Sequence, residues 1–153
     1  MKEWKCRTCG SNDISLRYTS GLNYCKDCQK YKNIKTNSKV ARKYKKCPSC
    51  NLKREDFMAW ISSKEKKCEY CSISECDLQG LEMRSSIGLV IESLGIDRVD
   101  SFGDYTFDNM VLCCFVCNRI KGIQFSNTEM KIIGKSICQI WESRMKVNDA
   151  SDY

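Results

Sequence analysis

The 153-residue sequence contains no histidine, one proline and no apolar run near the roughly 18 residues that cross a membrane. Without histidine the chain lacks the usual general base at neutral pH and a common zinc ligand. The first residues, MKEWKCRTCG, also lack the apolar stretch of a signal peptide. We therefore expect a soluble, intracellular (cytoplasmic) protein with no membrane partner.

Cysteine, by contrast, is abundant, with 13 residues. In an intracellular protein thiols stay reduced, so paired cysteines are read first as metal ligands. An odd number of cysteines also fits a complete disulfide framework poorly. We therefore expect metal sites built from thiolates.

The charge is distributed unevenly along the chain. Residues 1–53 hold 14 Lys/Arg against 3 Asp/Glu, whereas residues 54–153 hold 12 against 16. A one-sided basic charge suits a polyanionic partner, although a lysine-rich surface that is merely solvated is the alternative.

Three segments are expected. Residues 1–30 form a cysteine-framed module with short strand-like pieces, ISLRYTS and LNY. Residues 31–50 form a basic connector without apolar periodicity, which either lies along a phosphate backbone or is a flexible linker. Residues 51–153 form the main lobe.

Hydrophobic periodicity predicts the elements of this lobe. LKREDFMAWIS predicts a short helix, and the β-branched SIGLVIESLGIDRVD predicts a strand or hairpin. FSNTEMKIIGKSICQIWESRMK predicts a long helix that starts at a Ser126–Glu129 capping box. We expect its core stripe to contain Met130, Ile133, Ile137, Ile140 and Trp141.

CxxC pairs define the metal sites. Two pairs, separated by fifteen residues, have the spacing of a zinc ribbon with four thiolate ligands: Cys6, Cys9, Cys25 and Cys28. Three further pairs follow, Cys47/Cys50, Cys68/Cys71 and Cys114/Cys117. Spacing favours joining the first two of these, whereas joining the last two closes a long loop and places Asn118 at a helix start. From the spacing alone both pairings remain open.

Acids, amides and cations gather around the last CxxC. Asp97 on a strand and Asn118 at the following helix offer two hard oxygen ligands for one Mg²⁺-like ion. Taken singly such residues are more often turn or capping residues. Together, and in this order beside a CxxC, they indicate a site.

The pattern DR-x-D, Y-x-x-DN and C-x-x-CN-x-x-K resembles the ββα-metal (HNH) nucleases. The resemblance extends over the N-terminal CxxC pairs, FMAW, KCEYC with SISE, LGIDRVDSF, CFVCNRIK and the helix from FSNTEM onward. It implies an α+β, zinc-stapled nuclease fold with a second zinc site formed by Cys68, Cys71, Cys114 and Cys117. The CPSC at 47–50 and the lack of histidine are departures.

The resemblance also implies roles for individual residues. Asp97 and Asn118 would bind the catalytic cation, and Asn109 would brace the loop. Arg98, in the place of the family's histidine, would hold the scissile phosphate or stabilise the transition state, because arginine stays protonated. Two residues of the helix, Arg119 and Lys121, would clamp phosphates.

The group that activates water is then a separate question. We predict Tyr105, because a neighbouring arginine and a divalent cation favour the phenolate. The alternatives are Asp100, the metal alone, and Tyr70, which lies between two zinc ligands and is expected mainly to pack.

The sequence thus predicts a divalent-metal-dependent endonuclease for double-stranded DNA, most simply a type II restriction enzyme acting as a homodimer. Each chain would hold two structural zinc ions and one catalytic Mg²⁺. The basic segment would contact DNA through Lys39, Arg42, Lys43, Lys45 and Lys46. The alternatives are a homing or nicking endonuclease and a nucleic-acid-binding zinc protein with a decayed site.

Overall fold

The computed structural model describes residues 4–18, 23–43, 49–81, 83–85 and 88–150. The chain divides into two compact units. The first unit comprises Met1–Glu65 and Phe102–Met110, and the second comprises Lys66–Ser101 and Val111–Tyr153. None of the helices in these described ranges is long and apolar enough to cross a membrane.

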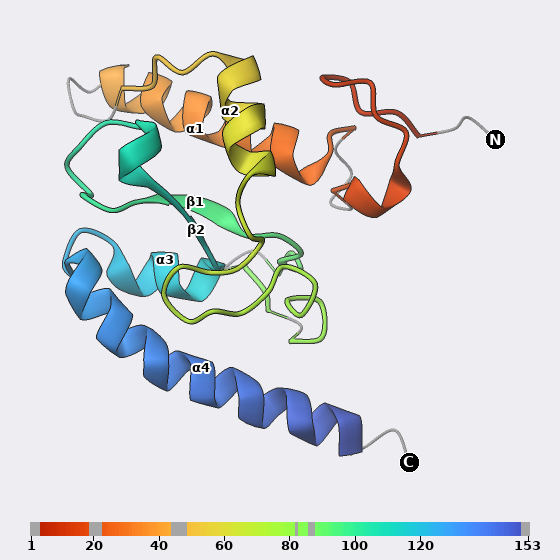
Figure 1. Ribbon diagram of the computed structural model, residues 1–153, viewed down its shortest axis with the longest axis vertical. Coiled ribbons are helices and arrows are strands. Elements are labelled where there is room, and N and C mark those ends of the chain that lie inside the picture. The colour runs from red at the N-terminus through yellow and green to blue at the C-terminus, as the bar shows by residue number, and fades with distance from the viewer. Residues whose placement is uncertain (1–3, 19–22, 44–48, 82, 86–87, 151–153) are drawn as a thin grey trace. The chain divides into compact units, whose positions relative to one another are not determined.

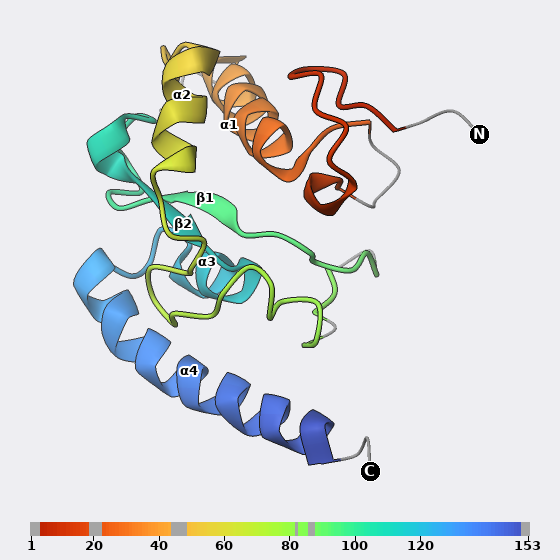
Figure 2. The same ribbon diagram turned by 45° about the vertical axis from the view of Figure 1, so that its right-hand side comes forward.

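The first unit is built on two helices, α1 (Lys26–Lys43) and α2 (Arg54–Ser62), which pack side by side (Figures 1 and 2). Short 3₁₀ helices lie at Ile14–Leu16 (η1) and Phe107–Asn109 (η2). An aromatic contact joins the two main helices, since the rings of Tyr31 and Phe57 lie 5.3 Å apart. Phe57 and Ile61 of α2 are completely buried, which confirms the predicted short helix.

Helix α1 differs from the predicted connector. The segment 31–43 continues a helix that begins at Lys26, and only the residues after Lys43 leave it. Ile34 and Ser38, one helical turn apart, are buried against the unit. The strand-like piece at ISLRYTS is also different: it contains η1, followed by a single bridge between Arg17 and Cys25.

The second unit has the order strand, strand, helix, helix. Strands β1 (Gly95–Arg98) and β2 (Met110–Cys113) pair, helix α3 (Phe115–Lys121) packs against β1, and helix α4 (Asn127–Ala150) packs against α3. Figures 1 and 2 both show α3 between the sheet and α4. The predicted β-branched stretch thus supplies one short strand, preceded by a bridge between Arg84 and Val90.

Helix α4 starts at the predicted capping box. The Ser126 backbone N–H donates to Glu129 Oε2 (2.8 Å), and the Glu129 N–H donates to Ser126 Oγ (3.2 Å). The core stripe is only partly as expected. Met130, Ile137 and Trp141 are buried, but Ile133 is only half-buried and Ile140 is 49% exposed. The buried stripe runs instead through Met130, Gly134, Ile137 and Trp141, at helical spacing.

Gly134 is the point at which α4 touches the turn that carries Cys68 and Cys71. A Cβ at this position would lie 2.2 Å from the carbonyl oxygen of Tyr70. We predict that Gly134→Ala destabilises the protein by about 1–3 kcal/mol, because α4 must move away from the backbone of that turn. Denaturant unfolding measures the change, with Ser136→Ala on the exposed face of the same helix as control. Equal midpoints for the two variants would contradict this close approach.

Candidate metal and active site

Two clusters of four cysteines form within the described residues. One contains Cys6, Cys9, Cys25 and Cys28, and the other contains Cys68, Cys71, Cys114 and Cys117. In each cluster all four Sγ atoms lie within 4.8 Å of one another. The resemblance therefore selected the right partner for Cys68/Cys71.

The sulfur spacing fits a tetrahedral ion. Cys9 and Cys25 have Sγ atoms 3.8 Å apart, and Cys71 and Cys114 have Sγ atoms 3.7 Å apart. A tetrahedron with metal–sulfur bonds of about 2.3 Å has edges of about 3.8 Å. Both clusters are thus shaped to hold a metal ion with four thiolates, which leaves no open coordination position.

The two clusters are built in the same way from local structure. In the first CxxC of each, the residue after the second cysteine has a positive φ (Gly10, 76°; Ser72, 58°). Its N–H donates to the carbonyl of the first cysteine, at 3.0 Å in both clusters.

The second CxxC of each cluster opens a helix. Cys25 precedes α1 and Cys114 caps α3, and in each case the sulfur accepts the N–H of the cysteine three residues later at 3.4 Å. The N-terminal module differs here from a ribbon of two hairpin turns, because its second cysteine pair lies in a helix start.

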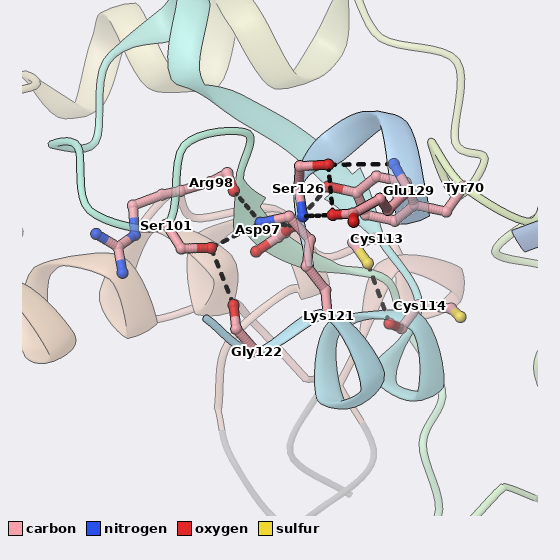
Figure 3. Close-up of polar contacts among 10 residues, drawn as sticks. All are labelled: Tyr70, Asp97, Arg98, Ser101, Cys113, Cys114, Lys121, Gly122, Ser126 and Glu129. Carbon is pink, nitrogen blue, oxygen red and sulfur yellow. Dashed lines mark hydrogen bonds and ion pairs between the residues drawn. The ribbon is translucent and has the colours of Figure 1, made fainter. Parts of the chain in front are cut away.

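Asp97 of β1 lies at the centre of a buried polar network in the second unit (Figure 3). Its side chain is 8% exposed. Oδ2 accepts a hydrogen bond from the Tyr70 hydroxyl (2.7 Å) and pairs with Lys121 Nζ (3.2 Å). Both contacts use Oδ2, and among the described residues no hydrogen bond or ion pair involves Oδ1.

Lys121, the last residue of α3, is fully buried. Besides Asp97, its ammonium donates to the Arg98 carbonyl (2.6 Å) and to Ser101 Oγ (2.8 Å). These two hydrogen bonds and the ion pair with Asp97 surround the buried ammonium. In this structure Lys121 holds β1 and the following turn, whereas we expected its ammonium to contact a phosphate.

Asn118, the other expected cation ligand, lies in α3. It is half-buried and precedes Lys121 by three residues, so the two side chains share one side of α3. The same side carries the metal-cluster residue Cys117. Asp97 and Asn118 thus come from two elements that pack together, as a shared cation requires.

The two arginines have less confined side chains. Arg98 is half-buried, and its guanidinium points away from the Asp97 carboxylate in Figure 3, because consecutive residues of a strand face opposite sides. Arg119 is exposed, with its guanidinium carbon 5.7 Å from the centre of the Phe115 ring.

Tyr105 and Asn109 belong to the first unit. Tyr105 is 7% exposed, and its backbone N–H donates to the Ser49 carbonyl. The amide of Asn109 donates from Nδ2 to the Asp104 carbonyl (2.9 Å), which ties the two ends of the loop together.

The predicted basic segment is described only in part. Lys39 is exposed on α1. Arg42 and Lys43 lie in the helix, but their side chains are outside the described residues, as are Lys45, Lys46 and Cys47 altogether. Among the spare cysteines, Cys50 and Cys113 are buried, Cys76 is exposed and Cys138 is half-buried.

Sequence reasoning missed Ser101 and undervalued Tyr70. Ser101 carried no signal, because a single serine after a strand is common. Tyr70 did carry one: as an x residue of a CxxC turn it must stay close to the metal cluster. Burial, the hydrogen bond to Asp97 and the charge of that carboxylate all raise the pKa of the Tyr70 phenol well above its ordinary value.

Comparison with known proteins identifies the family of this chain. No protein-family model and no curated protein sequence matches the chain. Its structure is similar to that of the rare-cutting HNH restriction endonuclease PacI, with a TM-score of 0.77 and 34% sequence identity. The similarity covers 92% of this chain and 96% of that one. The chain therefore belongs to the HNH restriction endonuclease family.

Proposed function

We propose that this protein hydrolyses phosphodiester bonds of double-stranded DNA with a divalent cation, as a type II restriction endonuclease. The observation that carries the proposal is the buried Asp97 carboxylate, held on one oxygen by Tyr70 and Lys121 beside a four-cysteine cluster. An oriented carboxylate beside a helix amide is a suitable partial shell for Mg²⁺.

Two kinds of metal would be present. The thiolate clusters fit structural zinc, whose affinity supports folding of small units. Asp97, through Oδ1, and Asn118 would hold Mg²⁺ or a similar cation. When bound, that cation supplies charge stabilisation to a reacting phosphate.

Other residues would handle the DNA around this centre. Arg98, whose guanidinium points away from Asp97 in Figure 3, and the exposed Arg119 would contact phosphates. Asn109 would keep its loop rigid through the bond to Asp104. Lys121 would position Asp97 without touching DNA, because it is fully buried.

Tyr70 is now a stronger candidate than Tyr105 for accepting a proton from the attacking water. The Tyr70 hydroxyl lies 2.7 Å from Oδ2 of Asp97, which would bind the cation. A general base must first be close enough to the water that it deprotonates, and its pKa is considered after that. The contact with Asp97 raises the pKa of Tyr70, so little phenolate exists at neutral pH. The rate should therefore increase with rising pH in the alkaline range.

Paired tyrosine variants test this assignment. We expect Tyr70→Phe to lower the cleavage rate by at least about 100-fold and to remove the alkaline rise, with DNA affinity unchanged. Tyr105→Phe should keep both rate and pH profile. Single-turnover cleavage between pH 6 and 10 gives the answer. The reverse pattern would restore Tyr105 as the base, and two active variants would leave activation to the metal alone.

Cutting both strands at one site calls for two active centres. With one centre in each chain, we propose a two-fold symmetric homodimer. Light scattering after size-exclusion chromatography measures the mass, free and bound to a DNA duplex. A single chain on DNA that still linearises plasmids would contradict the dimer.

Incubation with plasmid and phage DNA plus Mg²⁺, followed by sequencing of the ends, tests the function directly. Linear products with fixed ends support a restriction enzyme, whereas nicked circles at long sites would favour a nicking or homing enzyme. If the wild-type protein binds DNA but does not cleave it in Mg²⁺ or Mn²⁺, the chain would be a DNA-binding zinc protein whose nuclease site is inactive. EDTA and Asp97→Asn serve as controls.

A further inference from the structure

The outer face of α1 combines amides, small side chains and cations. Residues 28–43 contain no acid. Six side chains of α1 that follow Tyr31 are exposed: Lys32, Asn33, Thr36, Asn37, Lys39 and Val40. Asn33, Thr36, Asn37 and Val40 have the spacing i, i+3, i+4 and i+7, so they form one continuous stripe.

The helix behind this stripe is firmly anchored. It begins at the cysteine cluster, where the Cys28 N–H donates to Cys25 Sγ. In its middle the Tyr31 hydroxyl donates to the Leu52 carbonyl (3.0 Å), and Lys35 Nζ donates to the Cys50 carbonyl (3.0 Å). The exposed stripe is therefore carried by an element that is rigid before any ligand binds.

One amide in the stripe is also held in orientation. Gln29 Nε2 donates to Asn33 Oδ1 at 2.7 Å, and Gln29 itself is only 9% exposed. A buried side chain that fixes the plane of an exposed amide lowers the entropy cost when that amide binds a planar partner.

We propose that α1 lies in the DNA major groove and reads base edges with Asn33, Thr36 and Asn37, while Lys32 and Lys39 contact phosphates. This proposal rests on the proposed endonuclease function and assigns its sequence recognition. A helix about 10–12 Å wide fits a groove about 12 Å wide. The absence of acids along residues 28–43 complements the phosphate charge.

The residue types on the stripe indicate which bases are read. An asparagine amide pairs with the N6 and N7 edge of adenine, and the methyl groups of threonine and valine contact the thymine methyl. We therefore infer that the half-site contains A·T pairs opposite the middle of α1.

Selection from a randomised duplex library, followed by sequencing, tests the assignment. Asn33→Ala and Asn37→Ala should each relax the preference at one or two neighbouring positions, with a loss of discrimination of roughly 5- to 150-fold. Lys32→Ala and Lys39→Ala should weaken binding to all sequences alike and lower the salt slope by about one each. Asn51→Ala, an exposed asparagine outside α1, is the matched control and should keep the wild-type preference.

Each outcome bears on one claim only. Unchanged preference in the two α1 asparagine variants, or an equal loss on all sequences, would overturn base reading by α1. A wild-type protein that neither binds nor cuts DNA would overturn the proposed function instead. Circular dichroism and zinc content show whether each variant is folded. A misfolded alanine variant is replaced by Asn33→Gln or Asn37→Gln. Glutamine keeps the amide group but moves it outward by one methylene.

Discussion

Asp97→Asn is expected to lower DNA cleavage by at least about 100-fold while DNA affinity stays within about two-fold of wild type. The loss follows because the variant removes the charged oxygen ligand of the catalytic cation, and even outer partners of metal ligands contribute about 10- to 100-fold. Asparagine keeps an oxygen that can accept from Tyr70 and Lys121. The fold should therefore survive.

Asparagine is a better test here than alanine. Lys121 is fully buried, and its ammonium pairs with Asp97 Oδ2. Asp97→Ala would remove both the charge and the oxygen that face this ammonium, and breaking a buried pair on one side costs about 3–5 kcal/mol. Asp97→Asn also removes the charge but keeps an oxygen at the same place, so its cost should be smaller. An inactive Asp97→Ala protein could thus simply be unfolded.

The measurements separate metal binding from catalysis. Cleavage is followed under single-turnover conditions, DNA affinity by anisotropy in Ca²⁺, and Mn²⁺ binding by electron paramagnetic resonance. Asp56→Asn, an exposed acid on α2, is the matched control and should behave as wild type. Normal turnover or unaltered Mn²⁺ binding by Asp97→Asn would mean that another group holds the cation. Asn118→Ala is expected to give the same pattern as Asp97→Asn.

Cys68→Ser is expected to unfold the second unit and to reduce the zinc content from two ions per chain to one. Structural zinc sites contribute about 10–16 kcal/mol of binding free energy, which is comparable with the whole stability of a domain. The regular sheet of this part of the chain is small. It has two strands of four residues, and α3 packs directly onto one of them.

Metal analysis and calorimetric unfolding check this prediction. Chelation of the wild-type protein should reproduce the loss of cooperative unfolding. Cys138→Ser removes a half-buried thiol outside both clusters, which donates to Glu142, and should retain two zinc ions at nearly normal stability. A folded Cys68→Ser protein with two zinc ions would show that the second cluster is not a structural site.

The elements with strong local signals were predictable from the sequence. The apolar spacing around Phe57 and Ile61 produced α2, and the Ser126–Glu129 box placed the start of α4. These features depend on residues three or four positions apart, which a helix brings together in any context. CxxC spacing likewise brings two thiolates into one turn.

Helix α1 was not predictable in the same way. Its inward face holds Ile34 and Ser38 but no long apolar stripe, so no helical period stands out. Contacts from elsewhere hold it: Phe57 packs on Tyr31, and the Cys50 carbonyl accepts from Lys35. Propensity is a weak prior beside such tertiary contacts.

The sequence alone was enough to predict the metal-ligand types, the basic first half and, through its motifs, the nuclease family. Which oxygen of Asp97 is occupied, and that Lys121 is buried beside it, could be seen only in the folded structure. The same is true of the contact between Tyr70 and Asp97, 27 positions apart. The physical reason is that burial and pairing depend on which distant segments pack together. Arg119 and Lys121 are an example, because both are basic residues of α3 and look alike in the sequence. Only the packing of α3 on β1 shows that Arg119 is exposed and that Lys121 reaches a buried carboxylate.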